Sequence, residues 1–572
     1  MTAPRSFPAA PHRAWCGAAI ALLAALPYLN GLHGDFVFDD AIVVRDNPSV
    51  TQGAPTALLT SVYALGAVYR PLTMLTYAAN HRVSPDPFGY HVVNLGLHVL
   101  VCLALFALVL ELLGSLPAAS AAAALFAVHP VHTEAVTSMV GRAELLAALL
   151  VFIALFAQVR AVRQSSRRWS AFGVGSFALA LLAKESAFTA IALAAAVAWW
   201  IDPRRSVRRV LRATAPFAVV GLAYLPLRWM VVGALGWPYP PPFVDNPLAH
   251  VPAWPRIGTA LVVLYEYCSL LFLPINLVAD YSYNQIPIVT SPFDGRLLLA
   301  AAVLLAAGAG VAAAVRHAPA LALAAAFASI PLALTANVLF PIGTIKAERL
   351  LYLPSAGWCL AAGWLFAAAL RRRPMAAVAA VVIATFAFAV RTWVRNADWR
   401  DDLALFSAAV EGAPNSSKVH HNLAVALQRA GRLDEALAHY RETLRIYPDY
   451  AAAAFGIGHI HALRGDDAGA VYWYHTALHR DWQLCSAHLQ LGLVHERRRE
   501  YTAAEAAFTT GLAIEPGNPL LLVNLAAARL AQGDRWGARA ALEQLDHSAP
   551  APDANTRALV TAVREEIEGA LR

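Results

Sequence analysis

Two adjacent carboxylates, Asp39 and Asp40, stand directly after the first long apolar run of the chain, which covers about residues 15–32. A carboxylate at the exit of a membrane span costs desolvation energy unless it is solvated, paired or used. An aspartate in this place is able to act as a general base that takes the proton of a hydroxyl nucleophile. We expect the pair on an extended loop, where neighbouring side chains point in opposite directions, so only one of them serves as the base. The alternative is a solvated turn or a helix cap.

Further polar residues interrupt the apolar sequence in small groups that we expect to gather on one membrane face. The candidate substrate-binding residues among them are Arg70, His129, His132, Glu134, Arg142, Glu144, Lys184, Glu185, Asp280, Tyr281, Lys346, Glu348 and Arg349. Clustering on one face favours a site that opens to one compartment over a pore, whose polar groups follow the channel. His132 and Glu134 are two positions apart and do not share a helical face, so we predict no metal site there.

Each of these groups also has a purely structural alternative, because polar residues at membrane exits often serve packing or topology. The alternatives are a hydrogen-bonded helix junction at Pro130, an ion pair between Arg142 and Glu144, a solvated turn at Lys184 and Glu185, snorkelling of Lys346 and Arg349, and an interfacial aromatic belt at Tyr281.

The composition sets the class of protein. The chain has 572 residues, of which 59% are hydrophobic and only 14% charged, and this predicts a membrane protein with several spans. The net charge of +7 comes from arginine clusters between apolar runs, at 160–168, 204–212 and 371–373. Such clusters are typical of cytoplasmic loops facing anionic lipid, so we expect no nucleic-acid partner. The five cysteines lack metal-ligand spacing and indicate neither a zinc site nor a disulfide framework.

Apolar runs long enough to cross a bilayer predict a polytopic domain over residues 1–395, with the N-terminus in the cytoplasm. The first run has no small-residue cleavage site, so we read it as an uncleaved span. Placing all arginine clusters inside requires one run, 257–274, to be re-entrant or interfacial, since it carries Glu266 and follows a proline-rich loop. About eleven crossings remain, and the C-terminal domain then lies outside. The runs are roughly 14–32, 91–113, 117–137, 144–161, 171–189, 187–201, 213–233, 257–274, 297–315, 319–339, 350–370 and 375–393.

The last part of the chain repeats itself every 34 residues, the length of a tetratricopeptide repeat. Alanine recurs at one slot, and proline recurs at the end of the unit except where Trp482 replaces it; these residues are Ala436, Ala470, Ala504, Ala538, Pro448, Pro516 and Pro550. We predict a linker or helix over 396–414, four repeats at about 417–450, 451–484, 485–518 and 519–552, and a capping helix over 553–572. Four such repeats stack into an α-solenoid with a concave groove.

The groove of the solenoid is expected to bind a peptide or a protein. Its candidate polar groups are Asn422, His461, His495 and Asn524. His461 and His495 occupy the same slot of neighbouring repeats, which leaves a metal bridge open, although histidines on such helices more often only form hydrogen bonds. The alternative is a scaffold that positions the membrane domain.

The ordered set of motifs resembles the transmembrane and tetratricopeptide repeat-containing O-mannosyltransferases, within the GT-C class of lipid-linked-sugar transferases. The matching stretches are residues 35–40 with Asn47 and Pro48, 69–73, 87–91 with Asn94 and His98, 126–136 with Gly141 and Arg142, 184–185, 280–283 and 348–355. The resemblance implies an all-α fold in which a GT-C-like helical membrane domain precedes the solenoid. It also implies transfer of a sugar, mannose by default, from a polyprenyl-phosphate carrier to a serine or threonine hydroxyl of a protein.

The implied reaction takes place on the extracytoplasmic face and agrees with the residue types. Asp39 or Asp40 serves as the base, and Arg142, Lys346 and Arg349 are candidates to stabilise the departing phosphate. A membrane-embedded donor requires no glycine-rich nucleotide motif, and the sequence requires no cofactor, while dependence on a divalent metal stays open. The alanine-rich and arginine-rich composition looks bacterial, which would place the protein in the inner membrane with an undecaprenyl carrier. The alternatives are a non-catalytic membrane scaffold for envelope complexes, and an enzyme of the same class with a lipid or glycan acceptor.

Overall fold

The computed structural model describes residues 10–53, 68–235, 239–547 and 554–571. Within these ranges every regular element is helical, so the expected all-α class is confirmed. The chain divides into two compact units, residues 1–414 and residues 415–572, and each is described by itself.

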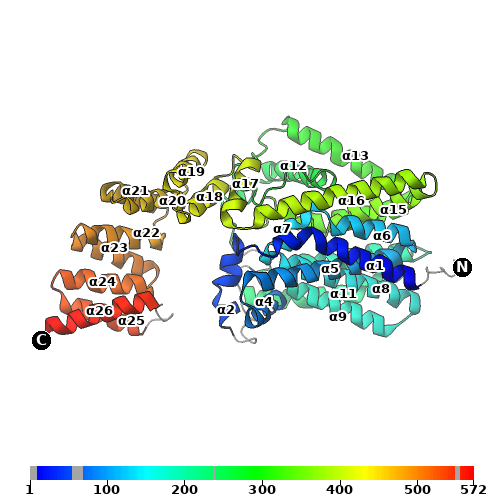
Figure 1. The fold of residues 1–572 in the computed structure, drawn as a ribbon. Helices are drawn as coiled ribbons and strands as arrows, with labels where there is room; N and C mark the ends of the chain where they lie inside the picture. The colour runs from blue at the N-terminus through cyan, green and yellow to red at the C-terminus, as the bar shows by residue number, and fades with distance from the viewer. Residues whose placement is uncertain (1–9, 54–67, 236–238, 548–553, 572) are drawn as a thin grey trace. The chain divides into compact units, whose positions relative to one another are not determined.

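Unit 1 is a bundle of long apolar helices joined by short helical turns (Figure 1). Its main helices are α1 (Ala10–Ala25), α2 (Pro48–Thr51), α4 (Pro71–Val83), α5 (Pro87–Leu113), α6 (Leu116–Ala127), α7 (Thr133–Thr137), α8 (Arg142–Gln164), α9 (Arg167–Ala183), α10 (Ala190–Ile201), α11 (Val207–Val232), α12 (Ala253–Phe272), α13 (Gly295–His317), α14 (Pro319–Thr335), α15 (Ser355–Leu370), α16 (Pro374–Asn396) and α17 (Asp402–Gly412). The 3₁₀ turns that matter below are η3 (Pro130–His132), η5 (Glu185–Thr189), η7 (Glu348–Leu351) and η8 (Ala397–Trp399).

The core of unit 1 lies where α5, α6, α8, α10, α14 and α15 meet. Small residues let these helices approach closely, as is common between membrane helices. A Cβ atom at Gly357 would meet the backbone of α14 at Ala324 and Ala328, and one at Gly363 would meet Ala118 of α6. The contacts between α15 and its two neighbours therefore depend on glycine at these positions.

Unit 1 has the helices of a multi-pass membrane protein. Six of its described helices are long and apolar enough to cross a bilayer, and shorter apolar helices lie between them. The apolar runs predicted at 117–137 and 171–189 are each interrupted, because α6 ends at Ala127 and α9 ends at Ala183. The expected count of eleven crossings stays a prediction. The six helices are Pro11–Gly31, Pro87–Leu113, Met139–Gln164, Val207–Val232, Gly295–His317 and Pro374–Trp399.

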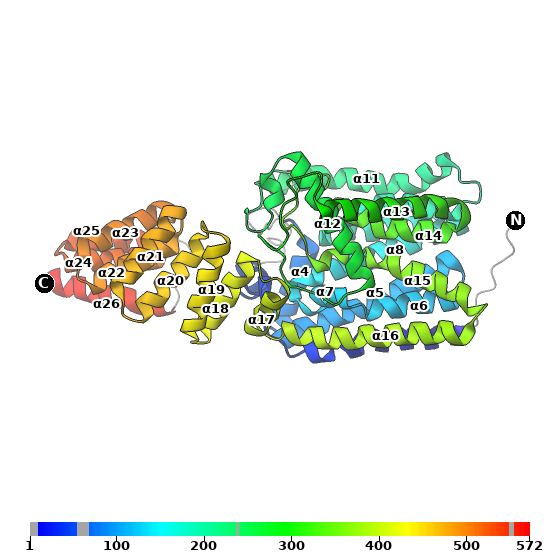
Figure 2. The ribbon, with the colours of Figure 1, turned by 90° about the horizontal axis from the view of Figure 1, so that it is seen from above.

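Different helices lie at the two ends of the bundle. Figures 1 and 2 show the N-terminal end of α1 and the turn between α15 and α16 at one end, with α4 and α17 at the other. At the end of α5, Glu111 binds Arg163 at 2.6 Å and Arg160 at 3.4 Å, so part of the arginine cluster is paired within the protein.

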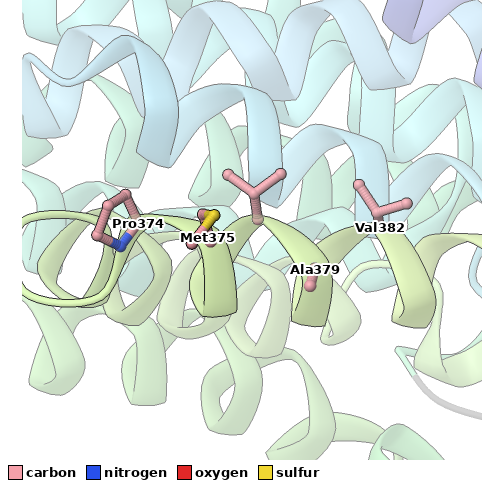
Figure 3. Close-up of a pocket in the computed structure, with 5 residues that line it drawn as sticks. Pro374, Met375, Ala379 and Val382 are labelled. Carbon is pink, nitrogen blue, oxygen red and sulfur yellow. The ribbon is translucent and has the colours of Figure 1, made fainter.

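The outer face of α16 carries a shallow hollow lined by Pro374, Met375, Val378, Ala379 and Val382 (Figure 3). All five residues are apolar, and Met375 and Val382 are largely exposed. Such a surface suits contact with hydrocarbon and offers no group for catalysis.

Unit 2 is a stack of helix pairs followed by a last helix (Figure 1). The alanines of the repeat slot are fully buried, and Gly456 and Gly492 lie against the rings of Tyr440 and Phe508. The first helices of the pairs begin at residues 417, 451, 485 and 519, which reproduces the period of 34. The helices are α18 (Ser417–Arg429), α19 (Leu433–Ile446), α20 (Ala451–Leu463), α21 (Asp467–Arg480), α22 (Cys485–Arg497), α23 (Tyr501–Ile514), α24 (Pro519–Ala531), α25 (Arg535–Asp546) and α26 (Ala554–Leu571), whereas Pro550 lies outside the described residues.

Candidate functional site

The structure separates the two adjacent aspartates, although not through an extended loop. Phe38 has a left-handed backbone with φ of 54°, and Asp39 and Asp40 then start a short helical segment. Successive helical side chains differ in direction by about 100°. As a result Asp40 is fully buried, whereas Asp39 is half-buried.

Asp40 joins two loops of unit 1. Its Oδ1 accepts hydrogen bonds from Ser138 Oγ at 3.1 Å and from the Val140 backbone N–H at 2.9 Å, and its Oδ2 accepts from the Val37 N–H at 3.3 Å. Burial raises the pKa of Asp40 from 3.8 to about 7, and the N–H groups of Val140 and Val37 oppose this rise. These contacts are those of a structural carboxyl group.

Asp39 faces a different environment. Within the described residues it forms no hydrogen bond and no ion pair shorter than 4 Å, but it lies in electrostatic reach of Arg349. Burial lowers the pKa of Arg349, and the carboxylates of Glu134 and Asp39 more than reverse this, so the pKa of Arg349 is raised. Asp39 is therefore a partly accessible carboxylate beside a cation.

Glu134, from α7, holds Arg349, from η7. The backbone N–H of Arg349 donates to Glu134 Oε2 at 2.8 Å, and its Nη1 donates to the other oxygen of the same carboxylate. Glu134 is 2% exposed, whereas the side chain of Arg349 is 28% exposed. The pair thus fixes the guanidinium from its buried side, and the rest of its edge stays accessible.

The neighbouring residue, Glu348, points the other way into the protein. It is fully buried and accepts hydrogen bonds from the Tyr281 hydroxyl at 2.8 Å and from the Val278 N–H, while Arg395 Nη2 lies 3.9 Å away. Burial raises the pKa of Glu348 to about 7; Arg395 lowers it and Glu134 raises it further. This contact network anchors the η7 turn that carries Arg349.

A second group of charges surrounds the turn between α9 and α10. Arg70 binds Glu185 through two hydrogen bonds of 2.9 and 2.6 Å, and Lys184 forms an ion pair with Glu144. The two pairs lie within electrostatic reach of each other, and Glu144 also lies within reach of Arg349. Four predicted residues from three separate parts of the sequence are therefore brought together in a group that lies within electrostatic reach of Arg349.

Arg228 belongs to the same neighbourhood and was missed by the sequence analysis. It lies near the end of α11, is 6% exposed, and donates from Nε to the Leu235 carbonyl at 2.9 Å. Tyr224 lies in electrostatic reach of Arg228 and also of Glu185 and Arg70. The sequence signal that could have identified Arg228 is its place inside an apolar run, because a charged residue within a membrane span is energetically costly and often functional.

Other predicted residues lie inside the fold. Arg142 is fully buried and donates to Asn94 at 2.8 Å, Asn80 at 2.8 Å and the carbonyls of Thr76 and Tyr90, so Arg142 and Glu144 bind different partners. The guanidinium also lies over the rings of Tyr77 and Tyr90, at 4.8 and 5.4 Å from their centroids. Arg142 therefore ties α8 to α4 and α5.

His129 and His132 are fully buried at the junction between α6 and α7. His129 Nε2 bonds the Leu271 carbonyl at 3.1 Å, and His132 Nε2 bonds Ser355 Oγ at 2.7 Å. These hydrogen bonds hold both rings inside the helix junction, and neither ring is accessible to a substrate.

The remaining predicted residues of unit 1 line the loops next to η7. Lys346 binds Glu266 at 2.8 Å and lies 4.1 Å from the centroid of the Tyr281 ring. Asp280 accepts hydrogen bonds from the backbone N–H, at 2.7 Å, and the hydroxyl of Ser282. Among the residues that the structure describes, no cluster of three or more metal-ligating side chains has the geometry of a metal site.

In unit 2 the predicted groove histidines each bind a carboxylate of their own repeat. His461 Nδ1 lies 2.7 Å from Asp466, and His495 Nδ1 lies 2.6 Å from Glu500. The Asn524 amide donates to the Leu520 carbonyl at 2.7 Å, and Asn422 is half-buried on α18. His461 and His495 thus form equivalent contacts, each within its own repeat.

Comparisons with known proteins give the family. A family model described as Protein O-mannosyl-transferase TMTC, DUF1736 matches residues 241–308, and two tetratricopeptide repeat models match 411–480 and 497–563. Protein O-mannosyl-transferase TMTC4 of Mus musculus is 30% identical over 493 residues, which cover 75% of this chain and 66% of that protein. The chain belongs to the TMTC family. The resemblance expected from the sequence is thereby confirmed.

Other TMTC relatives match over a similar part of the chain. Tmtc3 of Drosophila melanogaster is 30% identical and F38B6.6 of Caenorhabditis elegans is 30% identical, each over 75% of this chain. The matches cover 55% and 62% of those two proteins, so the chain spans less than two thirds of their length. A tetratricopeptide repeat protein of Thermus thermophilus is 23% identical over 30% of this chain and 92% of that structure, with a TM-score of 0.26.

Proposed function

We propose that this chain is a membrane glycosyltransferase that transfers a sugar, mannose by default, from a polyprenyl-phosphate carrier to a serine or threonine hydroxyl of a protein. The observation that carries the proposal is the half-buried Asp39 beside the partly exposed Arg349, which Glu134 holds from behind. The printed name of the TMTC relatives, protein O-mannosyl-transferase, supports the same reaction.

In the proposed reaction Asp39 accepts the proton of the acceptor hydroxyl as that oxygen forms a bond to the anomeric carbon of the sugar. The bond from this carbon to the carrier phosphate oxygen breaks, and its electron pair leaves with the phosphate. Arg349 stabilises the departing anion, because its Nε and Nη2 form no hydrogen bond to the described residues. Glu134 keeps the guanidinium in place without neutralising that open edge.

The second group of charges extends the proposed site. Arg70 and Lys184, with Arg228, supply cations for the carrier phosphate, and their partners Glu185 and Glu144 orient them. Asp280, Tyr281, Lys346 and Glu348 shape the wall next to η7. His129, His132 and Arg142 act from inside the fold by positioning the helices around the site.

We further propose that the reaction faces the extracytoplasmic side, in a GT-C-like domain with about eleven crossings and a cytoplasmic N-terminus. The repeats then recruit the acceptor protein in the same compartment. Surface ion pairs connect neighbouring repeats, Arg464 with Asp434 and Arg497 with Asp467, both at 2.6 Å. Reporter fusions after Arg371 and Arg572 test this topology, and a cytoplasmic Arg572 would contradict it.

The function is tested by transfer of labelled sugar from a polyprenyl-phosphate donor to protein in membranes that contain Asp39→Asn or Arg349→Ala. Removal of a general base is expected to lower the rate by about 10²- to 10⁴-fold. Asp40→Asn is the matched control, and per folded molecule it should stay within about tenfold of the wild type, because Asp40 contacts only protein. Full transfer by Asp39→Asn would refute Asp39 as the base, whereas absence of transfer by the wild type would favour a non-catalytic scaffold. Mass spectrometry of the products separates a protein acceptor from a lipid or glycan.

A further inference from the structure

Helix α17, which follows the last long helix of unit 1, contacts the loop that carries the aspartate pair. The backbone N–H of Asp35 donates to the Arg400 carbonyl at 2.8 Å. The backbone N–H of Phe38 donates to Asp402 Oδ1 at 2.9 Å, in the first turn of α17. The Phe38 and Phe406 rings pack edge to face with their centroids 5.6 Å apart. These contacts connect positions more than 360 residues apart in the sequence.

The conformation that α17 holds is an unusual one. Phe38 has a φ of 54°, in the left-handed region that residues with a Cβ atom rarely adopt. Such a conformation persists when surrounding contacts determine it, and functional sites often contain one. Here the surrounding contacts include the Asp402 hydrogen bond to the Phe38 backbone and the Phe406 ring against the Phe38 side chain. Because Phe38 directly precedes Asp39, its conformation sets the direction in which Asp39 leaves the loop.

The other end of α17 reaches the second loop of the site. A Cβ atom at Gly412 would lie 2.6 Å from Cγ2 of Val278, so the helix approaches this loop as closely as glycine allows. The Val278 backbone N–H donates to Glu348, the residue before Arg349. A single helix of 11 residues therefore contacts both the loop of Asp39 and the loop that anchors η7.

We propose that α17 is a positioning element of the active site and that Asp402 is the positioning residue for Asp39. Asp402 holds Phe38 in its left-handed conformation and thereby directs the Asp39 carboxylate toward Arg349. This inference rests on the proposed function, in which Asp39 is the base. It makes the segment between the last long helix and the repeats a part of the catalytic unit and more than a spacer.

The test uses the full chain in detergent with two measurements for each variant. Hydrogen exchange of peptides that cover residues 35–40 reports the Phe38 and Asp35 amides, and sugar transfer reports kcat and KM for the donor. Asp402→Ala removes the acceptor, so we expect exchange in this segment to become roughly tenfold faster. We expect kcat to fall at least about tenfold with KM changed less than about twofold, because misorientation of a base affects the reaction more than binding. Asp402→Asn keeps an oxygen that can accept the Phe38 N–H and should restore both measurements.

The matched control is Asp401→Ala. Asp401 caps α17 through the Ala404 N–H at 2.8 Å, so this variant also removes one carboxylate and weakens the start of the helix. If Asp402→Ala acts only by loosening α17, the two variants behave alike and the proposal is overturned. The proposal is also overturned if hydrogen exchange of residues 35–40 is no faster in Asp402→Ala than in the wild type.

Two further variants keep the test decisive. If Asp402→Ala does not fold, Phe406→Leu removes the ring contact with Phe38 and keeps an apolar side chain, and it should produce the same rise in exchange and fall in kcat. Asp39→Asn is measured in parallel, since full transfer by that variant refutes Asp39 as the base, while exchange still judges whether α17 holds the loop.

Discussion

Replacement of Asp40 by asparagine changes the stability of the protein in a way that depends on pH. Asp40 is fully buried, and burial raises its pKa to about 7 from the value of 3.8 that applies in the unfolded chain. The folded state therefore binds this proton more tightly than the unfolded state does. The contribution of Asp40 to stability is full below about pH 4 and is lost as pH rises to about 7.

The size of the effect follows from these two pKa values. Between pH 5 and pH 8 the free energy of unfolding of the wild type falls by about 3 kcal/mol. This follows because the pH rises by about two units before it reaches the folded-state pKa, at about 1.36 kcal/mol per unit. Asparagine does not titrate, so the variant escapes this loss. It keeps an oxygen for Ser138 and Val140 but presents an NH₂ group to the Val37 N–H, which costs about 1–3 kcal/mol at every pH.

We therefore expect Asp40→Asn to be less stable than the wild type at pH 5 and to equal or exceed it at pH 8. Thermal unfolding of both proteins in the same detergent, measured across this range, gives the difference, in which all other titrating groups cancel. Asp39→Asn is measured in parallel, because it removes the neighbouring carboxylate and leaves the contacts of Asp40 in place. A difference between Asp40→Asn and the wild type that stays constant from pH 5 to 8 would refute the reasoning.

Three further outcomes are expected. Arg142→Gln should lower the free energy of unfolding by at least about 3 kcal/mol, measured by thermal melting, because it leaves several buried acceptors unpaired on α4 and α5. Glu134→Gln should lower sugar transfer by about 10- to 100-fold, since Arg349 loses its anchor. Glu111→Gln, which breaks the two ion pairs with Arg160 and Arg163 at the C-terminal end of α5, should change transfer less than about twofold. Gly492→Ala should destabilise the repeats by about 1–3 kcal/mol, seen as faster hydrogen exchange in α22 and α23, because its Cβ atom would overlap the Phe508 ring; unchanged exchange there would show that the ring can move aside.

Much of the architecture could be predicted from local patterns in the sequence. The period of 34 placed the helix pairs of unit 2, because each pair is one repeating unit whose small and apolar residues recur at fixed slots. Long apolar runs located the helices of unit 1, but polar breaks such as His129–Pro130 and Lys184 divided some runs into shorter helices. The number of membrane crossings was therefore harder to predict from the sequence than the positions of the helices.

The sequence by itself determined the all-helical class, the repeats, the family and the general set of charged residues in the loops between the apolar runs. Only the tertiary structure decided which of these charges meet. It separated Asp39 from the buried Asp40, joined Arg349 to Glu134 across 215 residues, and brought Asp402 onto Phe38 across 364. The physical reason is that helical periodicity is a local property, whereas an ion pair or a hydrogen bond to a distant loop depends on how helices pack, and adjacent residues of one type look alike until packing buries one of them.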